Sequence, residues 1–331
     1  MRCEYGKCRS IVGELDVLAQ SPGDSSTSLI AGMTAALTFF FTGEIGQASQ
    51  AADRVFKAYE PEGHRQLVHI YNHDPKCLTL VWAGYWLWAM GYPDKARQAA
   101  KEQLELSRRL EHPFNLFVAL SVGTVGLTVC GETSLARQWL EEAKTIADEH
   151  AMKFMAEIIV PFWDGPALIV QGEYEKGYAR LTIGSNGWRS TGPLHLIPFA
   201  NIMRARALTA LERFDEATDL LNETLQIIDE TGHRSEEAEV HCAIGELQQR
   251  RTHADAGAAE VSFKKGLEIA RFQGAKGWEL RAAKCLASLW QSQGKRKEAH
   301  DLLAPIYNWF TEGFDTKDLI EAKALLVDLN E

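Results

Sequence analysis

Three closely spaced histidines are the first candidates for chemistry in this sequence. His64, His69 and His73 lie in the segment EPEGHRQLVHIYNHDP, and imidazole is a common zinc ligand. Intervals of five and four residues place only His69 and His73 on one helical face, and no cysteine or glutamate completes a tetrahedral set with them. We therefore expect histidines of a loop and of helix ends here, and no metal site.

The cysteines offer no better case for a metal or redox centre. They are scattered, and none has the CxxC spacing of a zinc or thiol–disulfide site; they are Cys3, Cys8, Cys77, Cys130, Cys242 and Cys285. Cys3 and Cys8 are close enough to pair or to share a metal, but no further ligand lies nearby. Scattered, reduced thiols fit a cytoplasmic protein.

Motifs of catalysis and nucleotide binding are missing. The Gly-rich segment TIGSNGWRSTGP, residues 182–193, lacks the GxxxxGK[ST] pattern of a phosphate-binding loop and follows no predicted strand, so we expect a plain loop. Serine, histidine and aspartate occur without a nucleophile elbow or an HExxH pair. The sequence therefore predicts no catalytic residue, no cofactor and no enzyme activity.

Charge and hydropathy exclude two classes of partner. The net charge of −10 provides no basic surface for the phosphates of DNA or RNA. No uninterrupted apolar run approaches the roughly 20 residues that a membrane span needs. We expect a protein that binds neither nucleic acid nor membrane.

The elements that must position any site are helical hairpins, as the segment 277–310 shows most clearly. Ala283, Leu286, Ala287 and Trp290 recur at helical spacing, a break follows at Gly294, and a second amphipathic helix comes after it. One hairpin cannot bury both apolar stripes by itself. Neighbouring hairpins must supply the rest of the core.

The same hairpin pattern recurs along the chain with a period near 40 residues. A small residue marks the start of each second helix, and successive markers lie 48, 40, 41, 40, 42 and 40 residues apart; they are Ala48, Ala96, Ala136, Gly177, Ala217, Ala259 and Ala299. Five residues before most markers a glycine is expected to end the first helix in the left-handed conformation. Glu212 and Ala254 depart from this rule.

The order of small residue, turn glycine and small residue resembles tetratricopeptide repeats, although their usual period is about 34 residues. We predict an all-α fold, a right-handed superhelical solenoid of about seven tetratricopeptide-like hairpins. Residues 1–28 are expected to form part of a preceding repeat, with a helix at Ser10–Gln20 and a turn at 21–28. Residues 29–310 would form the hairpins, and 311–331 a C-terminal capping helix with Leu319, Ala322, Leu326 and Leu329 on one stripe.

Two local features within this array are specific enough to test. Asp74 followed by Pro75 predicts a helix start, because Asp accepts from the free N–H groups of the first turn and Pro needs no donor at the first helical position. The helix after it carries Trp82, Tyr85, Trp86 and Trp88 around nearly its whole circumference. A helix that is apolar all round is either buried or lines a binding surface.

The segments HDPKCLTLVWAGYWLWAMGYPDKA, LERFDEATDLLNETLQIIDETG and WFTEGFDTKDLIEAKALL also carry a narrower resemblance. They look like the C-terminal repeat region of large bacterial proteins that join a class III adenylate or guanylate cyclase domain to a P-loop ATPase module. The resemblance implies a regulatory or scaffolding segment whose partners are proteins or peptides, including the catalytic or ATPase modules of a longer parent. It carries over no catalytic residue, because the chain lacks the motifs of both modules. A small-molecule sensor and a free-standing adaptor remain the alternatives.

If the first helix of each hairpin lines the concave surface, the groove is apolar at one end and polar at the other. Its predicted residues are Met33, Leu37, Phe40, Val81, Tyr85, Trp88, Val125, Phe162, Ile169, Ile202, Glu246, Arg281 and Lys284. An apolar strip suits an amphipathic helix or an extended peptide. Self-packing of the strip is the alternative. We expect Tyr85, Trp88 and Phe162 to face an open groove, so that alanine there would cost little stability.

Overall fold

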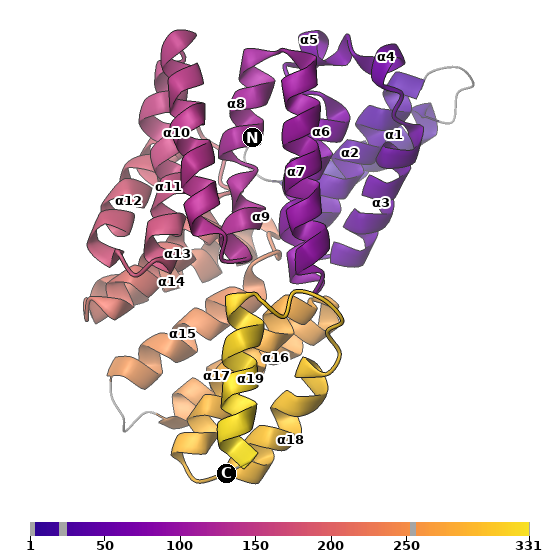
Figure 1. Cartoon of the computed structure of the whole chain (residues 1–331). Helices are drawn as coiled ribbons and strands as arrows, with labels where there is room; N and C mark the ends of the chain where they lie inside the picture. Colours follow the sequence, from indigo (N-terminus) through magenta and orange to yellow (C-terminus); the bar gives the residue numbers. More distant parts are fainter. Residues whose placement is uncertain (1–3, 20–24, 252–255, 331) are drawn as a thin grey trace.

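The computed structural model describes residues 4–19, 25–251 and 256–330 (Figure 1). These residues form helices and connecting turns, with no strand among them. Seven hairpins follow one another: α2 (Ser25–Phe41) with α3 (Ile45–Ala58), α6 (Pro75–Ala89) with α7 (Pro93–Leu110), α8 (Pro113–Ser121) and α9 (Thr124–Val129) with α10 (Thr133–Glu149), α11 (Val160–Val170) with α12 (Tyr174–Ser190), α13 (Ile197–Ala210) with α14 (Phe214–Thr231), α15 (Glu237–Arg251) with α16 (Ala256–Phe272), and α17 (Lys276–Ser292) with α18 (Arg296–Tyr307).

Shorter or single helices flank and interrupt this array. They are α1 (Tyr5–Leu18), α4 (Pro61–His64), α5 (Leu67–Tyr71), a π-helical turn at Met155–Ile159 and α19 (Lys317–Asn330). The short helices α4 and α5 account for the one long interval between repeat markers. The all-α solenoid predicted from the sequence is confirmed.

The turns within the hairpins follow the predicted chemistry. Gly43, Gly91, Gly131, Gly172 and Gly294 all have positive φ, between 78° and 93°. An L residue in this region carries a steric cost that glycine avoids. The turn of the sixth hairpin, including Ala254, lies outside the described residues.

Glu212 shows that the backbone rule holds even where the glycine is missing. Its φ is 61°, so it takes the left-handed conformation that glycine takes in the other turns. Its amide donates to Thr209 O at 3.2 Å, and the next amide, of Arg213, donates to Leu208 O at 2.9 Å. These bonds satisfy the last carbonyls of α13 and hold the turn in place despite the strain.

The predicted start of α6 at Asp74 and Pro75 is also confirmed. Asp74 Oδ1 accepts from the amide of Cys77 at 2.8 Å, and Pro75 occupies the first helical position. The other carboxylate oxygen accepts from the Tyr59 hydroxyl at 2.7 Å. The cap therefore also ties the end of the first hairpin to the second.

The Gly-rich segment 182–193 is not the loop that its composition suggested, because α12 continues through it to Ser190. Its glycines allow close packing between helices. A Cβ at Gly184 would lie 2.4 Å from Phe162 Cα, and a Cβ at Gly187 would lie 2.5 Å from Ile158 Cδ1. At Gly184 no larger residue fits without moving α11 away from α12, and at Gly187 the side chain of Ile158 would have to shift.

Two expectations at the N-terminus also need correction. The first helix begins at Tyr5 rather than Ser10, and Tyr5 is buried. The turn expected at 21–28 lies partly outside the described residues, and its remaining part, 25–28, belongs to α2.

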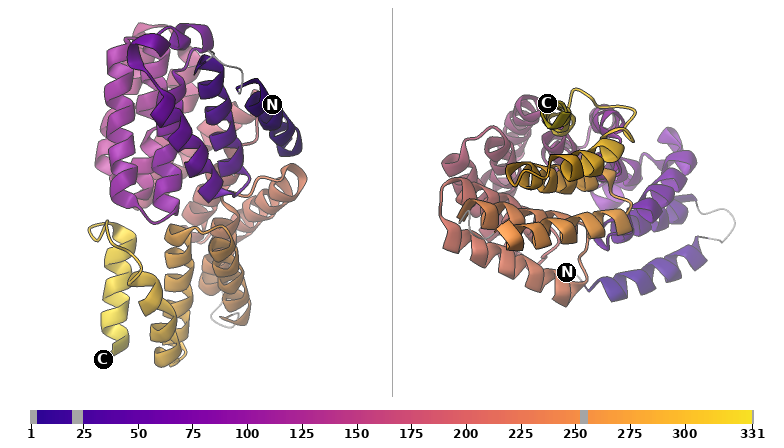
Figure 2. Two further views of the ribbon diagram at one scale, coloured as in Figure 1. Left: turned by 90° about the vertical axis from the view of Figure 1, so that its right-hand side faces the viewer. Right: turned by 90° about the horizontal axis from the view of Figure 1, so that it is seen from below.

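The chain curves until its last hairpins meet its first ones. Figures 1 and 2 show the hairpins from α15 onward beneath the earlier ones. Phe41 O accepts from the amide of Arg234 at 2.7 Å, and a Cβ at Gly277 would lie 2.6 Å from Trp88 O. Glu312 Oε1 accepts from the amide of Asp94 at 2.9 Å. The concave side is consequently enclosed by contacts between residues roughly 200 positions apart.

Candidate functional site

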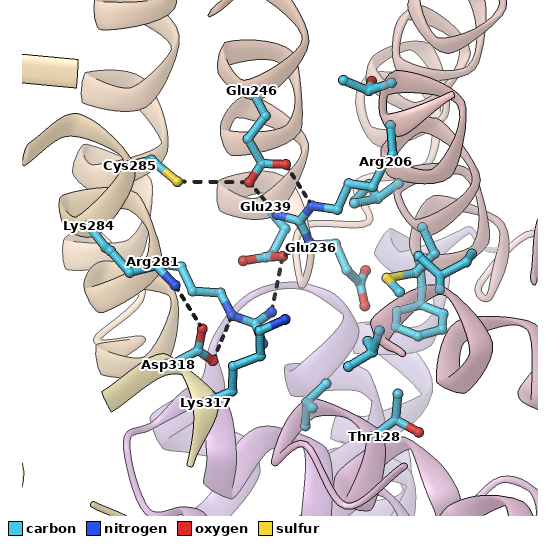
Figure 3. A pocket seen from close by; sticks show the side chains of 18 of the residues that line it. Thr128, Arg206, Glu236, Glu239, Glu246, Arg281, Lys284, Cys285, Lys317 and Asp318 are labelled. Atoms are coloured by element: carbon cyan, nitrogen blue, oxygen red, sulfur yellow. Dashed lines mark hydrogen bonds and ion pairs between the residues drawn. The ribbon is translucent and has the colours of Figure 1, made fainter. Parts of the chain in front are cut away.

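A cavity of about 710 Å³ lies on the concave side of the solenoid (Figure 3). Its lining comes mainly from α6, α9, α11, α13, α15 and α17, which belong to the first halves of their hairpins, and from α19. The sequence places the first helix of each hairpin on the concave surface, and most of the lining of this cavity comes from such helices. Its volume falls within the range of about 300 to 1,000 Å³ that is typical of ligand sites.

One wall of the cavity is apolar. Its side chains come from α6, α9, α11 and α13, and include Tyr85, Val129, Ile169, Phe199, Ile202 and Met203. On α13 the apolar Ile202 and Met203 lie about one helical turn before Arg206, where the polar wall begins.

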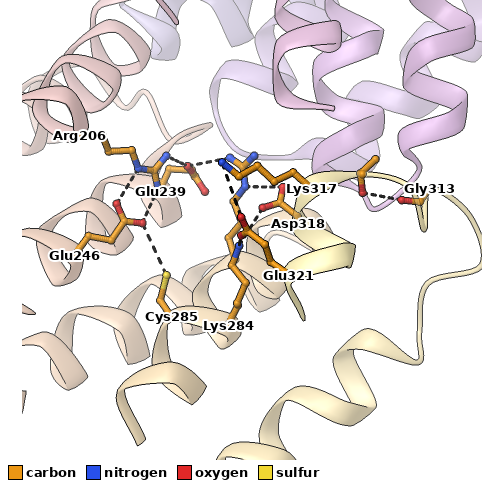
Figure 4. A network of polar contacts seen from close by, with 11 residues as sticks. Arg206, Glu239, Glu246, Lys284, Cys285, Gly313, Lys317, Asp318 and Glu321 are labelled. Carbon is orange, nitrogen blue, oxygen red and sulfur yellow. Dashed lines mark hydrogen bonds and ion pairs between the residues drawn. The ribbon is translucent and has the colours of Figure 1, made fainter. Parts of the chain in front are cut away.

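The polar wall is a network of ion pairs that crosses four elements (Figure 4). Arg206 of α13 contacts Glu239 Oε2 at 2.7 Å and Glu246 Oε2 at 3.0 Å on α15. Arg281 of α17 contacts the same Glu239 oxygen at 3.4 Å and Asp318 Oδ2 of α19 at 2.9 Å. Arg206 thus links α13 to α15, and Arg281 links α17 to both α15 and α19.

Lys284 extends this network along α17. It contacts Asp318 Oδ1 at 3.5 Å and also pairs with Glu321. Arg281 and Lys284 are three residues apart, as are Asp318 and Glu321, so each pair shares one helical face. The C-terminal helix α19 therefore supplies acids to the cavity as well as apolar side chains to the core.

Glu239 is the most deeply buried member of the network, with 4% of its surface exposed. Burial by itself would raise the pKa of its carboxyl, but the charges of Arg206 and Arg281 outweigh that effect and hold the pKa below its ordinary value. Glu239 is therefore ionised at neutral pH. Removing one partner of such a buried pair typically costs about 3 to 5 kcal/mol, because the other charge is left uncompensated.

The structure brings together six of the predicted groove residues. Tyr85, Ile169, Ile202, Glu246, Arg281 and Lys284 all line the cavity. The others lie elsewhere: Met33, Leu37, Phe40, Val81, Trp88, Val125 and Phe162 do not contribute to its lining. Phe40, Val81 and Val125 are buried in the core, and Met33 and Leu37 are half-buried.

The expectation that Tyr85, Trp88 and Phe162 are exposed is wrong. Their exposed fractions are 3%, 4% and 0%. The ring of Trp278 lies 6.2 Å from that of Tyr85 and 6.3 Å from that of Trp88, both at steep angles. The seventh hairpin thus covers the aromatic helix of the second, a contact that neighbour-to-neighbour packing does not predict.

Several lining residues escaped the sequence analysis. Arg206 lies one turn after Ile202 on the same helix face, so the 3.6-residue period could have found it. Asp318 and Glu321 lie outside the apolar stripe of α19, which is the only part of that helix for which the sequence predicts a contact. Phe199 and Met203 lie on α13, which is buried almost all round and has no distinct apolar face.

The histidine cluster has structural contacts. His64 is buried, its Nδ1 accepts from the amide of Glu60 at 2.9 Å, and its Nε2 lies 2.8 Å from Ser25 Oγ. His69 and His112 place their rings 5.4 Å apart. Over the described ranges, no group of three or more metal-binding side chains is close enough to hold an ion.

The structure describes five of the six cysteines. Cys77, Cys130, Cys242 and Cys285 are free thiols, and Cys3 lies outside the described residues. Burial raises the pKa of the Cys77 and Cys285 thiols to about 12.

Within the described part of the chain, no helix has both the length and the apolar character needed to span a membrane.

Comparison with known proteins bears on the fold. No family model and no curated protein sequence matches the chain. A Rap protein complexed with competence and sporulation factor aligns with a TM-score of 0.58 at 13% identity, over 99% of this chain and 94% of that one. The chain has a tetratricopeptide-like fold.

A second solved structure extends the comparison to a larger protein. It is a signal transduction ATPase with numerous domains that has a tetratricopeptide repeat sensor, from Pyrococcus horikoshii. It aligns with a TM-score of 0.54 at 16% identity, over 98% of this solenoid and 43% of that chain. At these identities the likeness shows the fold alone.

Proposed function

We propose that this solenoid is a non-catalytic sensing and interaction domain whose concave cavity binds a peptide or another ligand. The cavity itself carries the proposal, because first helices from six hairpins and the capping helix converge on one space with an apolar and an ionic wall. Mostly apolar clefts with a few placed polar groups are the usual form of ligand sites. A ligand there would contact helices from both ends of the chain and so favour the closed superhelix.

The geometry of a buried cluster of serine, histidine and glutamate supports a non-catalytic role. Ser235, His233 and Glu236 are in mutual contact and are all buried. Ser235 Oγ and Glu236 Oε2 both contact Nε2 of His233, while Nδ1 faces the Tyr5 hydroxyl at 3.2 Å. A triad needs the serine and the acid on opposite ring nitrogens. This cluster instead links α1 to the start of α15.

We further propose that the domain regulates a signalling protein in the cytoplasm, either an attached cyclase or ATPase module or a separate partner. The likeness to a tetratricopeptide repeat sensor within a multidomain ATPase supports the attached arrangement. The likeness to a Rap protein over nearly its whole length supports a free-standing adaptor.

A cavity-blocking variant tests the proposed site. Ala210 lines the cavity from α13 and is half-buried, so Ala210→Trp should fill part of the space. Screened against a synthetic library of short peptides, the unaltered protein is expected to give binders, and Ala210→Trp should weaken them by at least about tenfold, or 1.4 kcal/mol.

Ala304→Trp is the matched control, because Ala304 is also half-buried in a helix but lies on α18, away from the cavity. It should leave binding unchanged. Equal binding by both variants, or the absence of any binder, would contradict the proposal.

A further inference from the structure

The buried charges of the cavity do not balance. Acids outnumber bases by one among the lining side chains that are mostly shielded from solvent; the bases are Arg206, Arg281 and Lys284, and the acids are Glu236, Glu239, Glu246 and Asp318. The remaining basic lining residues, Arg250 and Lys317, are exposed at the rim. Their charges are screened by water and salt, so the shielded excess is acidic.

One carboxylate oxygen in this cluster has unused hydrogen-bonding capacity. Glu239 Oε2 accepts from Arg206 Nη1 at 2.7 Å and from Arg281 Nη1 at 3.4 Å. Glu239 Oε1 is buried and has no hydrogen-bond partner among the residues that the structure describes. An ionised carboxylate can accept about four hydrogen bonds, and a buried acceptor without any is uncommon.

The shielded bases, in contrast, already have acidic partners. Arg206 has Glu239 and Glu246, Arg281 has Glu239 and Asp318, and Lys284 has Asp318 and Glu321. An anionic ligand would have to displace one of these acids. A cationic donor would displace nothing and would offset the acidic excess.

We propose that the cavity recognises a primary ammonium or guanidinium group attached to an apolar body. This inference rests on the proposed function of the cavity and specifies the chemistry of its ligand. The cation lies against Glu239, which Figure 3 shows between Arg206 and Arg281, and the apolar body packs on Ile202 and Met203. A lysine or arginine side chain of a peptide and a small amphiphilic amine share this chemistry.

Three capped tetrapeptides that differ at one position test the inference. They place lysine, norleucine or glutamate between two leucines, followed by alanine, and hexylamine is the small-amine probe. Isothermal titration calorimetry is expected to show that the lysine peptide binds at least about tenfold more tightly than the norleucine peptide. This is the difference that a hydrogen bond to a charged group contributes. The glutamate peptide should bind more weakly still. If hexylamine binds as tightly as the lysine peptide, the ligand that supplies the cation is a small amine. If hexylamine binds more weakly, the ligand is a peptide.

Glu239→Gln should reduce the preference for lysine over norleucine to within about twofold. Arg206 keeps Glu246 and Arg281 keeps Asp318 in this variant, so each base retains a partner. Glu279→Gln is the matched control, because Glu279 is equally buried at 4% exposure and also pairs with two bases, Arg271 and Lys276, but lies outside the cavity. It should keep the full preference.

A salt titration of the unaltered protein gives a second readout that needs no variant. Raising the salt from about 0.05 to about 0.5 M should reduce the lysine preference without abolishing it and should leave the norleucine peptide nearly unchanged, because a contact shielded from solvent is screened less than the charges at the rim. The inference is overturned if the three peptides bind equally, if the glutamate peptide is preferred, or if the lysine preference survives Glu239→Gln. It is also overturned if no probe binds at concentrations up to about 1 mM. If the peptides bind without a lysine preference and this binding is lost in Ala210→Trp, the inference is overturned and the proposed function stands.

Discussion

Replacing Trp88 with alanine should lower the free energy of unfolding by about 3 to 5 kcal/mol, the loss typical of a large aromatic side chain in a core. Only 4% of Trp88 is exposed. Its ring stacks on Tyr85 at 6.4 Å, and the guanidinium of Arg281 lies 4.2 Å from its centroid. The change removes contacts that join the second hairpin to the seventh, so the loss includes part of the closure of the superhelix.

Urea denaturation followed by circular dichroism measures this loss. Phe272→Ala is the control, because Phe272 at the end of α16 is 93% exposed and its removal should change stability by no more than about 0.5 kcal/mol. A loss for Trp88→Ala that is as small as the control's would show that this face of α6 is open to solvent and that the hairpins do not close.

Deleting residues 316–331 should also destabilise the protein strongly. In α19, Leu319 and Leu329 are 2% and 6% exposed, and burial of each leucine contributes roughly 1.5 to 3 kcal/mol. The deletion also removes Asp318, which leaves Arg281 with Glu239 alone among its acidic partners. We expect a loss of at least about 4 kcal/mol together with aggregation, because terminal repeats need a cap over their exposed core.

Differential scanning calorimetry with light scattering provides the measurement for this deletion. Ile320→Ala is the point control, since Ile320 lies on the same helix but is 53% exposed. A melting curve that is unchanged by the deletion would contradict the capping role of α19.

Local sequence signals were sufficient to predict the repeat architecture. The recurring small residues and the turn glycines each act over a few residues, so they can be read without knowing the rest of the fold. Glu212 was a departure in the sequence, yet its backbone takes the same left-handed conformation as the glycines. Asp74 and Pro75 form the expected cap for the same local reason.

Contacts over long distances could not be predicted in this way. The burial of Trp88 depends on Trp278, which is 190 residues away and meets it only after the whole superhelix has turned. Gly184 was assigned to a loop because glycine is common in turns, whereas it is needed for the close approach of Phe162. The ion pairs of Arg281 with Glu239 and Asp318 likewise depend on how three separate elements meet.

Hydrogen exchange of the backbone amides, with and without the tightest-binding library peptide, tests the binding role of the concave cavity most directly. A ligand in the cavity stabilises the helices that it contacts and slows the opening that allows exchange. We expect slower exchange in α13, α15 and α17, whose residues line the cavity, and little change in α14 and α16, which contribute none to its lining. Protection confined to α14 and α16, or no protection in any helix, would contradict the account.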